Sequence, residues 1–325
     1  MDTPLISIII PTLNEESNIG RCLDSIFRQT YPKDKLEVIV VDDKSTDNTL
    51  KIIKGYPVKV LVSGKRHGEI SKMIGFKAAK GEFAIYLDAD IDLIGNDWFQ
   101  KMVKPLLEDE EIIGVFTRKY TKKSDPSVER FLTFDPLQRD SLYQFFSTSI
   151  DKTIVEKRKG YFVCEYKEGK IPPAGRCLYR RKKVLKLVSS YNMFLELDFL
   201  VLLVRHGFTK FAYVPAAGLY HHHAKNLFQL LGKRTYNLKK VYLAREERLY
   251  KWFDLESIAG FIKLSLWIVY ANLIIPSVLV GIYKSLKYKD MAGLYEPIVN
   301  FLVTDLLLFE SLKDSRTWKL LLNKK

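Results

Sequence analysis

Two pairs of aspartates end apolar segments of the sequence. Asp42 and Asp43 close VIVVDD, and Asp88 and Asp90 close AIYLDAD. In an extended segment residues i and i+2 point to the same side, so the carboxylates of Asp88 and Asp90 can converge. Two carboxylates together suit Mg²⁺ or Mn²⁺, whose other positions go to water and phosphate oxygens. An isolated Asp-x-Asp is more often a turn or a helix cap, but its place after an apolar strand favours a site for a divalent metal cation.

The first 110 residues contain the elements that would position these carboxylates. Short β-branched runs alternate with amphipathic segments, which is typical of a mostly parallel sheet with crossover helices. In such sheets ligands bind beyond the carboxyl ends of the strands. The sequence therefore predicts an α/β fold whose nucleotide-binding half covers 1–110. Strands are predicted at 5–10, 37–41, 58–62 and 83–87, and helices at 17–29, 46–54 and 70–80.

The rest of the chain changes character twice. Residues 111–225 are less regular, and this half is predicted to shape the site of a second substrate. Residues 227–251 are strongly basic with helical spacing of Leu and Tyr, which predicts a surface helix within a connector at 226–256. Residues 264–283 then form a stretch of 20 residues without a charge, long enough for a bilayer span. The apolar segment 298–309 contains Asp305 and is a poor span on its own.

Composition and charge narrow the class of protein. A hydrophobic fraction of 47% belongs to a folded chain, and three cysteines are too few for a disulfide framework. The net charge of +14 attracts phosphates, nucleic acid or anionic lipid headgroups. The N-terminal residues lack the basic region and cleavage site of a signal peptide, so the catalytic part is expected on the cytoplasmic side. Residues 257–325 are predicted to form a helical hairpin in or along the cell membrane, the alternative being a buried helix pair of a soluble protein.

Several ordered motifs resemble glycosyltransferase family 2, which has the GT-A fold. They are PTLNEE at 11–16, VVDDKSTDNT at 40–49, GEFAIYLDAD at 81–90, IPPAGRCLYRRKKV at 171–184, LELDFLVLLVRHGF at 195–208 and YVPAAGLYH at 213–221. The resemblance covers a predicted catalytic domain at 1–225. It implies an inverting glycosyltransferase that uses a UDP-, GDP- or dTDP-sugar and a divalent cation, with a lipid-linked or envelope glycan as acceptor.

The resemblance also implies roles for residues in these motifs. Asp90 and Asp88 would hold the cation that bridges the donor diphosphate, and His221 stands where many family members have a metal-binding or diphosphate-binding histidine. Lys72 occupies the place of a family arginine and is a candidate contact to the diphosphate. The nucleotide site would be lined by Pro11, Leu13 and Glu15, with Asp42 recognising the base.

The position of the catalytic base is open between two acidic residues. Counting back from Gly207, Glu196 falls on the position of the family's base, and Asp198 follows two residues later. The family's Glu-Asp pair is replaced here by Glu-Leu-Asp, and Glu196 is favoured. An acceptor hydroxyl needs a carboxylate within hydrogen-bond reach to take its proton. If the acceptor is a polyprenyl phosphate, no base is required, and Glu196 or Asp198 would orient the substrate instead.

Other classes of protein fit the sequence less well. A polyprenyl-phosphate sugar synthase is the nearest alternative, because only the acceptor differs. A sugar nucleotidyltransferase would need a Gly-rich, Arg-containing loop where this chain has PTLNEESNIG, and a nicotinamide oxidoreductase would need Gly-x-Gly-x-x-Gly. A basic polyanion-binding or scaffold protein would leave the acidic strand ends unexplained, so no nucleic-acid partner is expected.

Overall fold

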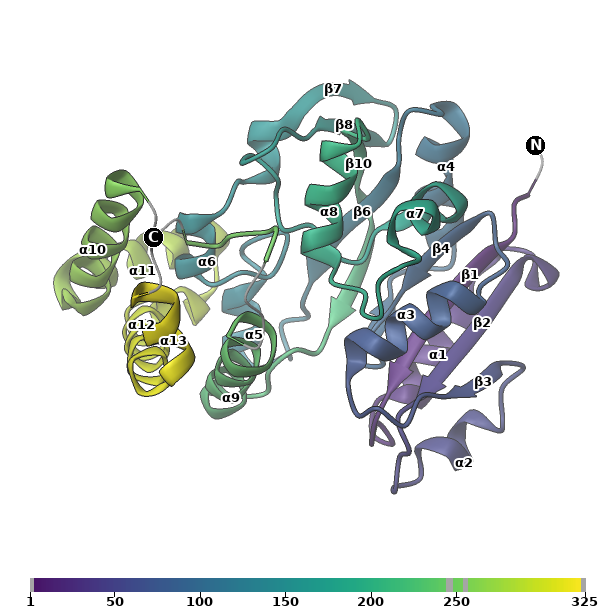
Figure 1. The fold of residues 1–325 in the computed structure, drawn as a ribbon, viewed down its shortest axis with the longest axis horizontal. Coiled ribbons are helices and arrows are strands. Elements are labelled where there is room, and N and C mark those ends of the chain that lie inside the picture. The colour runs from purple at the N-terminus through teal and green to yellow at the C-terminus, as the bar shows by residue number, and fades with distance from the viewer. Residues whose placement is uncertain (1–2, 244–247, 254–256, 323–325) are drawn as a thin grey trace. The chain divides into compact units, whose positions relative to one another are not determined.

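The computed structural model describes residues 3–243, 248–253 and 257–322, and these form two compact units (Figure 1). The sheet unit comprises residues 3–120 and 148–221. The helical unit comprises residues 121–147 and the described residues from 222 onward. The domain boundaries predicted at 225 and 256 stay predictions.

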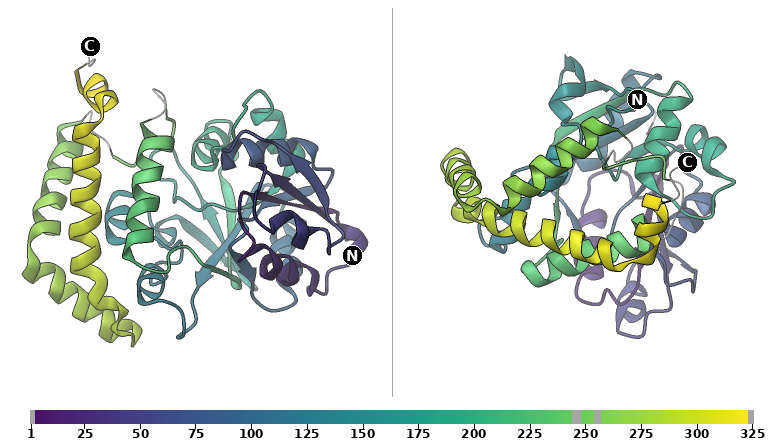
Figure 2. Two further views of the ribbon diagram at one scale, coloured as in Figure 1. Left: turned by 90° about the horizontal axis from the view of Figure 1, so that it is seen from below. Right: turned by 60° about the vertical axis from the view of Figure 1, so that its left-hand side comes forward.

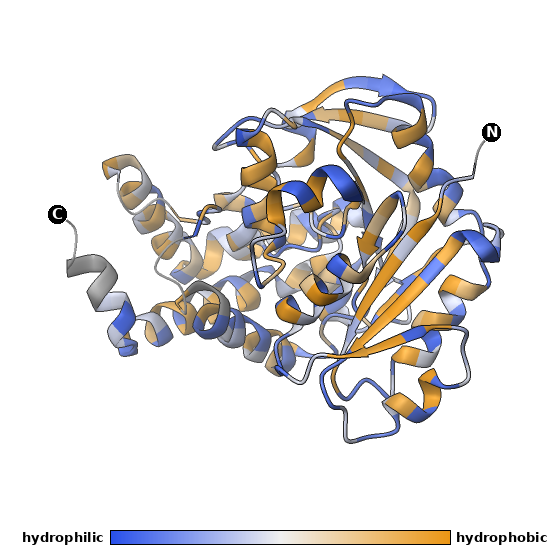
Figure 3. Cartoon of the chain, turned by 45° about the vertical axis from the view of Figure 1, so that its right-hand side comes forward, coloured by the Kyte–Doolittle hydropathy of each residue, from blue (hydrophilic) through white to orange (hydrophobic). Residues whose placement is uncertain are grey.

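The N-terminal half of the sheet unit is parallel, as predicted. Its strands are β1 (Ile6–Thr12), β2 (Leu36–Asp42), β3 (Lys59–Val62) and β4 (Phe83–Tyr86). β1 pairs with β2 and β4, and β2 pairs with β3, all in parallel. The β-branched runs that predicted these strands make them hydrophobic along most of their length (Figure 3). Because Thr12 pairs with Asp42, the carboxyl ends of β1 and β2 lie side by side.

The complete sheet is mixed, whereas a mostly parallel one was predicted. Its order is β3-β2-β1-β4-β9-β6-β10-β8-β7, with β5 pairing to β10. β9 is a three-residue strand that lies between β4 and β6 and runs antiparallel to both. A strand this short has no readable periodicity in the sequence. The bounds of the second half are β5 (Ile91–Leu93), β6 (Gly114–Tyr120), β7 (Ile154–Arg158), β8 (Tyr161–Glu165), β9 (Leu178–Arg180) and β10 (Lys210–His221).

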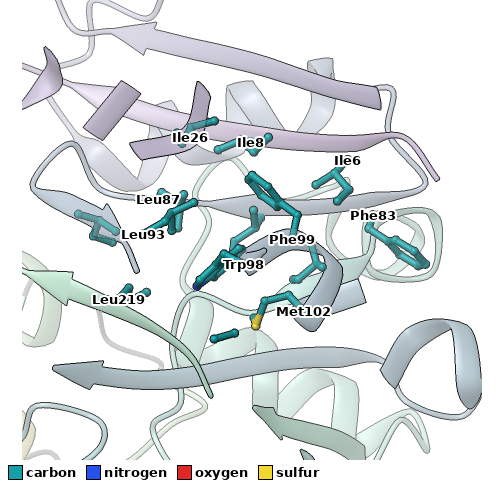
Figure 4. Packing of buried hydrophobic residues seen from close by; sticks show 14 of the residues in the cluster. Ile6, Ile8, Ile26, Phe83, Leu87, Leu93, Trp98, Phe99, Met102 and Leu219 are labelled. Carbon is teal, nitrogen blue, oxygen red and sulfur yellow. The ribbon is translucent and has the colours of Figure 1, made fainter. Parts of the chain in front are cut away.

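Helices cover both faces of the parallel half. α1 (Ile19–Phe27) and α4 (Trp98–Glu108) pack on one face, where Trp98 and Phe99 are fully buried against the strands (Figure 4). α3 (Gly68–Ala78) lies on the opposite face, against Ile9 and Val41. The remaining helices of the sheet unit are α2 (Thr49–Ile53), α7 (Arg181–Val188) and α8 (Glu196–Arg205). The parallel strands are thus covered by helices on both faces.

Gly75 lets α3 approach the sheet closely. A Cβ added at Gly75 would lie 2.3 Å from Cγ2 of Ile9, inside van der Waals contact. We expect Gly75→Ala to lower the free energy of unfolding by about 1–3 kcal/mol, as overpacking of a core does. Gly68 begins the same helix and has open space around it. Gly68→Ala should therefore change stability by no more than about 0.5 kcal/mol, and equal effects of the two in thermal unfolding would contradict this account.

The helical unit has its own small core. Trp267, Val299 and Val303 are buried in it, and the indole of Trp267 donates to Thr304 Oγ1 at 2.9 Å. Its elements are α5 (Ser127–Leu132), α6 (Ser141–Phe146), α9 (Leu227–Asn237), a π-helical turn (Leu238–Tyr242), α10 (Ile258–Asn272), α11 (Ile274–Tyr288), η4 (Met291–Leu294), α12 (Tyr295–Lys313) and α13 (Ser315–Leu322).

The basic helix is shorter than predicted. α9 ends at Asn237, and the π-helical turn that follows widens the ladder, with Leu243 N–H donating to Leu238 O at 2.8 Å. Residues 248–250 are not helical, and 244–247 lie outside the described residues. The prediction of one helix over 227–251 was therefore too long.

The uncharged segment 264–283 is not one straight helix. α10 ends at Asn272 and α11 begins at Ile274, with an angle of 81° between them. Pro276 explains the break, because it has no N–H to donate to Asn272 O and cannot continue the hydrogen bonds of α10. The segment predicted to be the poorer span lies instead in the continuous α12, seen in yellow in Figure 2, which includes Glu296 and Asp305. Among the described residues, 291–313 form one helix that is long and apolar enough to cross a bilayer, or one of two if the bent pair counts as a broken span.

Candidate active site

The register of β10 against β5 brings three candidate metal ligands together. β4 ends at Tyr86, and the chain then presents Asp88 and Asp90 on either side of the buried Ala89. β10 runs antiparallel to β5, which starts directly after Asp90, and pairs His221 with Ile91. One ligand atom from each of Asp88, Asp90 and His221 lies within 4.8 Å of the others, with His221 Nε2 at 3.4 Å from Asp90 Oδ1. The structure thus brings together the residues predicted to bind the cation.

The chemistry of this group fits a divalent cation. Burial, helped by the nearby Arg176 guanidinium, lowers the pKa of His221 to about 4. The imidazole is therefore neutral at pH 7 and has a lone pair to offer. Two carboxylates and one neutral imidazole are a donor set for Mn²⁺, and the carboxylates alone would also suit Mg²⁺. His222 belongs to the helical unit, where its Nδ1 lies 4.0 Å from Glu129 Oε2.

Two cationic side chains neutralise Asp88. Arg176 donates through Nε to Asp88 Oδ2 at 2.9 Å and through Nη2 to the same oxygen. Lys72 Nζ lies 3.8 Å from Asp88 Oδ1 and donates to Glu69 Oε1 at 2.9 Å. Burial acts to raise the pKa of Asp88, but Arg176 and Lys72 together hold it well below its usual range. Lys72, the predicted diphosphate contact, therefore lies beside the candidate metal site.

Sequence reasoning missed Arg176. It stands in the loop before β9, with φ at +62°, a conformation rare for a side-chain-bearing residue. Nothing in the sequence separates it from the other lysines and arginines, because its approach to Asp88 depends on a loop that folds from a distant part of the chain. The motif IPPAGRCLYRRKKV contained it, and that was the only available signal.

Glu196 is the first residue of α8 and is buried, with 7% of the residue exposed. Its carboxylate accepts hydrogen bonds from Tyr86 OH, from Tyr179 OH at 3.2 Å and from Cys177 N–H at 3.2 Å. Gly175 leaves room for it, because a Cβ there would lie 2.6 Å from Glu196 Oε2. Burial raises the pKa of Glu196 above its ordinary value, although these hydrogen bonds oppose the shift. A carboxylate with a raised pKa is a suitable proton acceptor.

Tyr86 connects Glu196 to the cationic side of the site. It precedes Asp88 by two residues, and Lys72 Nζ lies 4.2 Å from the centre of its ring. Asp198 is buried on the same helix as Glu196, two positions further on. Residues i and i+2 of a helix do not face the same direction. Glu196, and not Asp198, is therefore the carboxylate hydrogen-bonded to Tyr86 OH.

The residues predicted to bind the nucleotide meet at the ends of β1 and β2. Pro11 is near the end of β1, while Leu13 and Glu15 follow it in the next loop. Asp42 is fully buried and accepts hydrogen bonds from Thr12 Oγ1 at 3.2 Å, Ser45 N–H at 2.9 Å and Ser45 Oγ at 2.6 Å. Asp42 thus holds the loop after β2 through Ser45. Its role in reading a base stays a prediction.

The mixed sheet and its acidic edge define an α/β protein of the GT-A type. A mannosyltransferase from Pyrobaculum calidifontis, solved in complex with GDP-Man and Mn²⁺, has a similar fold, with a TM-score of 0.55 and 17% identity over 100% of this chain and 89% of that one. Residues 7–185 match the family model named Glycosyl transferase family 2. The chain belongs to glycosyltransferase family 2, so the predicted fold and family are confirmed.

Curated relatives match about half of the chain. A dolichyl N-acetyl-alpha-D-glucosaminyl phosphate 3-beta-D-2,3-diacetamido-2,3-dideoxy-beta-D-glucuronosyltransferase of Methanococcus voltae is 32% identical over 165 residues, or 45% of this chain and 50% of that protein. The glycosyltransferase AglE of Haloferax volcanii is 28% identical over 167 residues, or 49% of this chain and 52% of that protein. The chain therefore spans about half the length of these relatives.

Proposed function

We propose that this protein transfers a sugar from a nucleotide-diphosphate donor to a lipid-linked or envelope glycan acceptor, with inversion and with a divalent cation bound. The observation that carries the proposal is the convergence of Asp88, Asp90 and His221 at the edge of the sheet. The name of the Methanococcus voltae relative includes a dolichyl-phosphate-linked sugar, which supports a lipid-linked acceptor.

Each residue of the site has a part in this reaction. Asp88, Asp90 and His221 would hold the cation, which when bound offsets the negative charge that builds on the departing diphosphate. Lys72 would bind that diphosphate, and its position beside Asp88 supports this role. Glu196 would accept the proton of the attacking acceptor hydroxyl, while Tyr86 and Tyr179 hold its carboxylate in place. Pro11, Leu13, Glu15 and Asp42 would line the nucleotide site.

Donor binding gives the direct test. We expect one class among UDP-, GDP- and dTDP-sugars to stabilise the purified protein against heat in the presence of Mn²⁺. At a hundredfold excess over the dissociation constant, mass action adds about 2.7 kcal/mol. The same donors with EDTA are the control and should give a much smaller shift. If no donor stabilises a protein that is otherwise folded, the nucleotide-sugar function is wrong.

An exposed apolar face on α10 and α11 supports membrane attachment. These helices contain three lysines and no acidic residue. Trp267 is buried, but most of the large apolar side chains of both helices are exposed. An apolar surface of this extent marks an interface. The exposed side chains are Ile258, Phe261, Ile262, Leu266, Val269, Leu273, Ile274, Ile275, Leu279, Ile282, Tyr283, Leu286 and Tyr288.

We propose that this face contacts the cell membrane with the sheet unit on the cytoplasmic side. The cytoplasmic leaflet is anionic, and it attracts exposed basic side chains such as Lys263 on α10 and Lys287 on α11. The chain's net charge of +14 acts in the same direction.

Vesicle flotation tests the membrane contact. Ile274 and Ile275 stand at the bend and are 75% and 74% exposed. We expect the double substitution Ile274→Asp, Ile275→Asp to weaken binding to anionic vesicles roughly tenfold, a loss of about 1.4 kcal/mol, because it places two charges in the apolar contact. Leu107→Asp makes the same change at an exposed apolar side chain of the sheet unit and should bind as the wild type does. Equal flotation of all three proteins would place the contact elsewhere.

A further inference from the structure

Arg176 engages two of the three candidate metal ligands at once. Its guanidinium donates to Asp88 Oδ2 through both Nε and Nη2. Nη2 also lies 3.3 Å from His221 Nε2. A guanidinium carries donors and no acceptor, so a hydrogen bond to this nitrogen uses the lone pair that a metal ion would need. Arg176 therefore contacts two of the three residues that form the candidate metal site.

The site needs a positive charge when no cation is bound. Asp88 and Asp90 are close together and largely enclosed, and a carboxylate removed from water without a partner is costly. Lys72 supplies only part of this charge, because its ammonium group is shared with Glu69 and lies 3.8 Å from Asp88. Arg176 is the closer partner, because both of its hydrogen bonds end on Asp88 Oδ2, and hydrogen bonds between charged groups are stronger than those between neutral groups.

Arg176 and a divalent cation cannot both use these atoms. If the cation takes Asp88 Oδ2 and His221 Nε2, the guanidinium loses its hydrogen bonds and meets a second positive charge at short range, which is strongly repulsive in a partly buried site. The diphosphate of a donor is the natural new partner, because guanidinium groups bind phosphate oxygens in the same forked geometry as carboxylates.

We propose that Arg176 is a displaceable counterion of the metal site, which competes with the divalent cation for Asp88 and His221 and moves to the donor diphosphate when the cation binds. The inference rests on the metal site of the proposed function. It has two consequences. The cation alone binds weakly, and a nucleoside diphosphate strengthens cation binding partly through Arg176, since coupling between two ligands is reciprocal.

Titration of the full-length protein with Mn²⁺, followed by the electron paramagnetic resonance signal of the free ion, tests the first consequence without an activity assay. We expect Arg176→Gln to bind Mn²⁺ about tenfold or more tightly than the wild type in the absence of nucleotide, because a positive charge next to the site is removed. Arg176→Lys keeps the positive charge but has no guanidinium to donate two hydrogen bonds to Asp88. Its affinity for Mn²⁺ should therefore lie between those of the wild type and Arg176→Gln. Arg205→Gln removes a surface arginine that pairs with Glu168 and should match the wild type.

The second consequence is tested by repeating the titrations with UDP, GDP and dTDP. The nucleotide that strengthens Mn²⁺ binding in the wild type should strengthen it less in Arg176→Gln. If the wild type binds Mn²⁺ and neither Arg176 variant binds it more tightly, the counterion role is wrong and the metal site stands. If no protein binds Mn²⁺ with or without nucleotide, both proposals fail. Binding by Arg176→Gln alone would support the counterion role most directly.

Discussion

Replacement of Asp90 by asparagine is expected to lower the rate of sugar transfer by about a thousandfold, or about 4 kcal/mol of transition-state stabilisation. Asp90 belongs to the candidate metal site, where its Oδ1 lies 3.4 Å from His221 Nε2. An amide oxygen is a weaker ligand than a carboxylate, so the cation that offsets the diphosphate charge is held less tightly.

The measurement is release of nucleoside diphosphate from the donor at several Mn²⁺ concentrations, with a membrane lipid extract as acceptor. Asp97→Asn is the matched control, since Asp97 is an exposed carboxylate that pairs with Lys101, and its rate should stay near that of the wild type. High Mn²⁺ should restore part of the activity of Asp90→Asn, because the loss is one of metal affinity. A rate for Asp90→Asn within a few-fold of the wild type at low Mn²⁺ would show that Asp90 does not hold the cation.

The parallel half of the sheet could be predicted because its signals are local. The runs that form β1, β2 and β4 are apolar and β-branched, and each ends in the polar residues that close it. The neighbouring positions of Asp88 and Asp90 follow from two-residue alternation within one segment. What the sequence could not show is β9, whose three residues lie between strands from distant parts of the chain.

The non-local half of the candidate site was predicted only where the family resemblance reached it. His221 came from the resemblance, and the pairing of β10 with β5 accounts for its place. The resemblance assigned no role to Arg176, although one of its motifs contains this residue. The approach of Arg176 to Asp88 depends on the loop before β9. The spacing of residues in the sequence does not show which distant arginine or lysine a folded loop will bring to a carboxylate.

In the C-terminal region, composition alone gave a wrong prediction of helix continuity. An uncharged run of 20 residues at 264–283 meets the length of a bilayer span. Pro276 breaks it into α10 and α11. Hydropathy is averaged over a window of residues and does not detect a single missing N–H group. In the folded chain that missing donor interrupts the helical hydrogen bonds. The bend does not remove the exposed apolar face of α10 and α11, because exposure depends on which side chains the rest of the helical unit covers.

Glu196→Gln is expected to lower the rate of transfer by about a hundredfold or more, the usual contribution of a positioned general base. Asp198→Asn should have a much smaller effect, because Glu196 is the carboxylate hydrogen-bonded to Tyr86 OH and Tyr179 OH. Glu168→Gln, at an exposed glutamate that pairs with Arg205, is the control for the loss of a charge. Similar losses in Glu196→Gln and Glu168→Gln would remove Glu196 from the reaction.

The pH dependence of the rate separates a base from a residue that only orients the substrate. The base must be ionised, so activity rises as the pH rises through the pKa of Glu196. Burial raises that pKa above the ordinary value of 4.5, which places the acidic limb of the profile above pH 4.5. Tyr86→Phe removes a hydrogen bond to the ionised carboxylate and should move the limb to still higher pH. If the acceptor is a polyprenyl phosphate, no proton is taken, and Tyr86→Phe would leave the limb where it is.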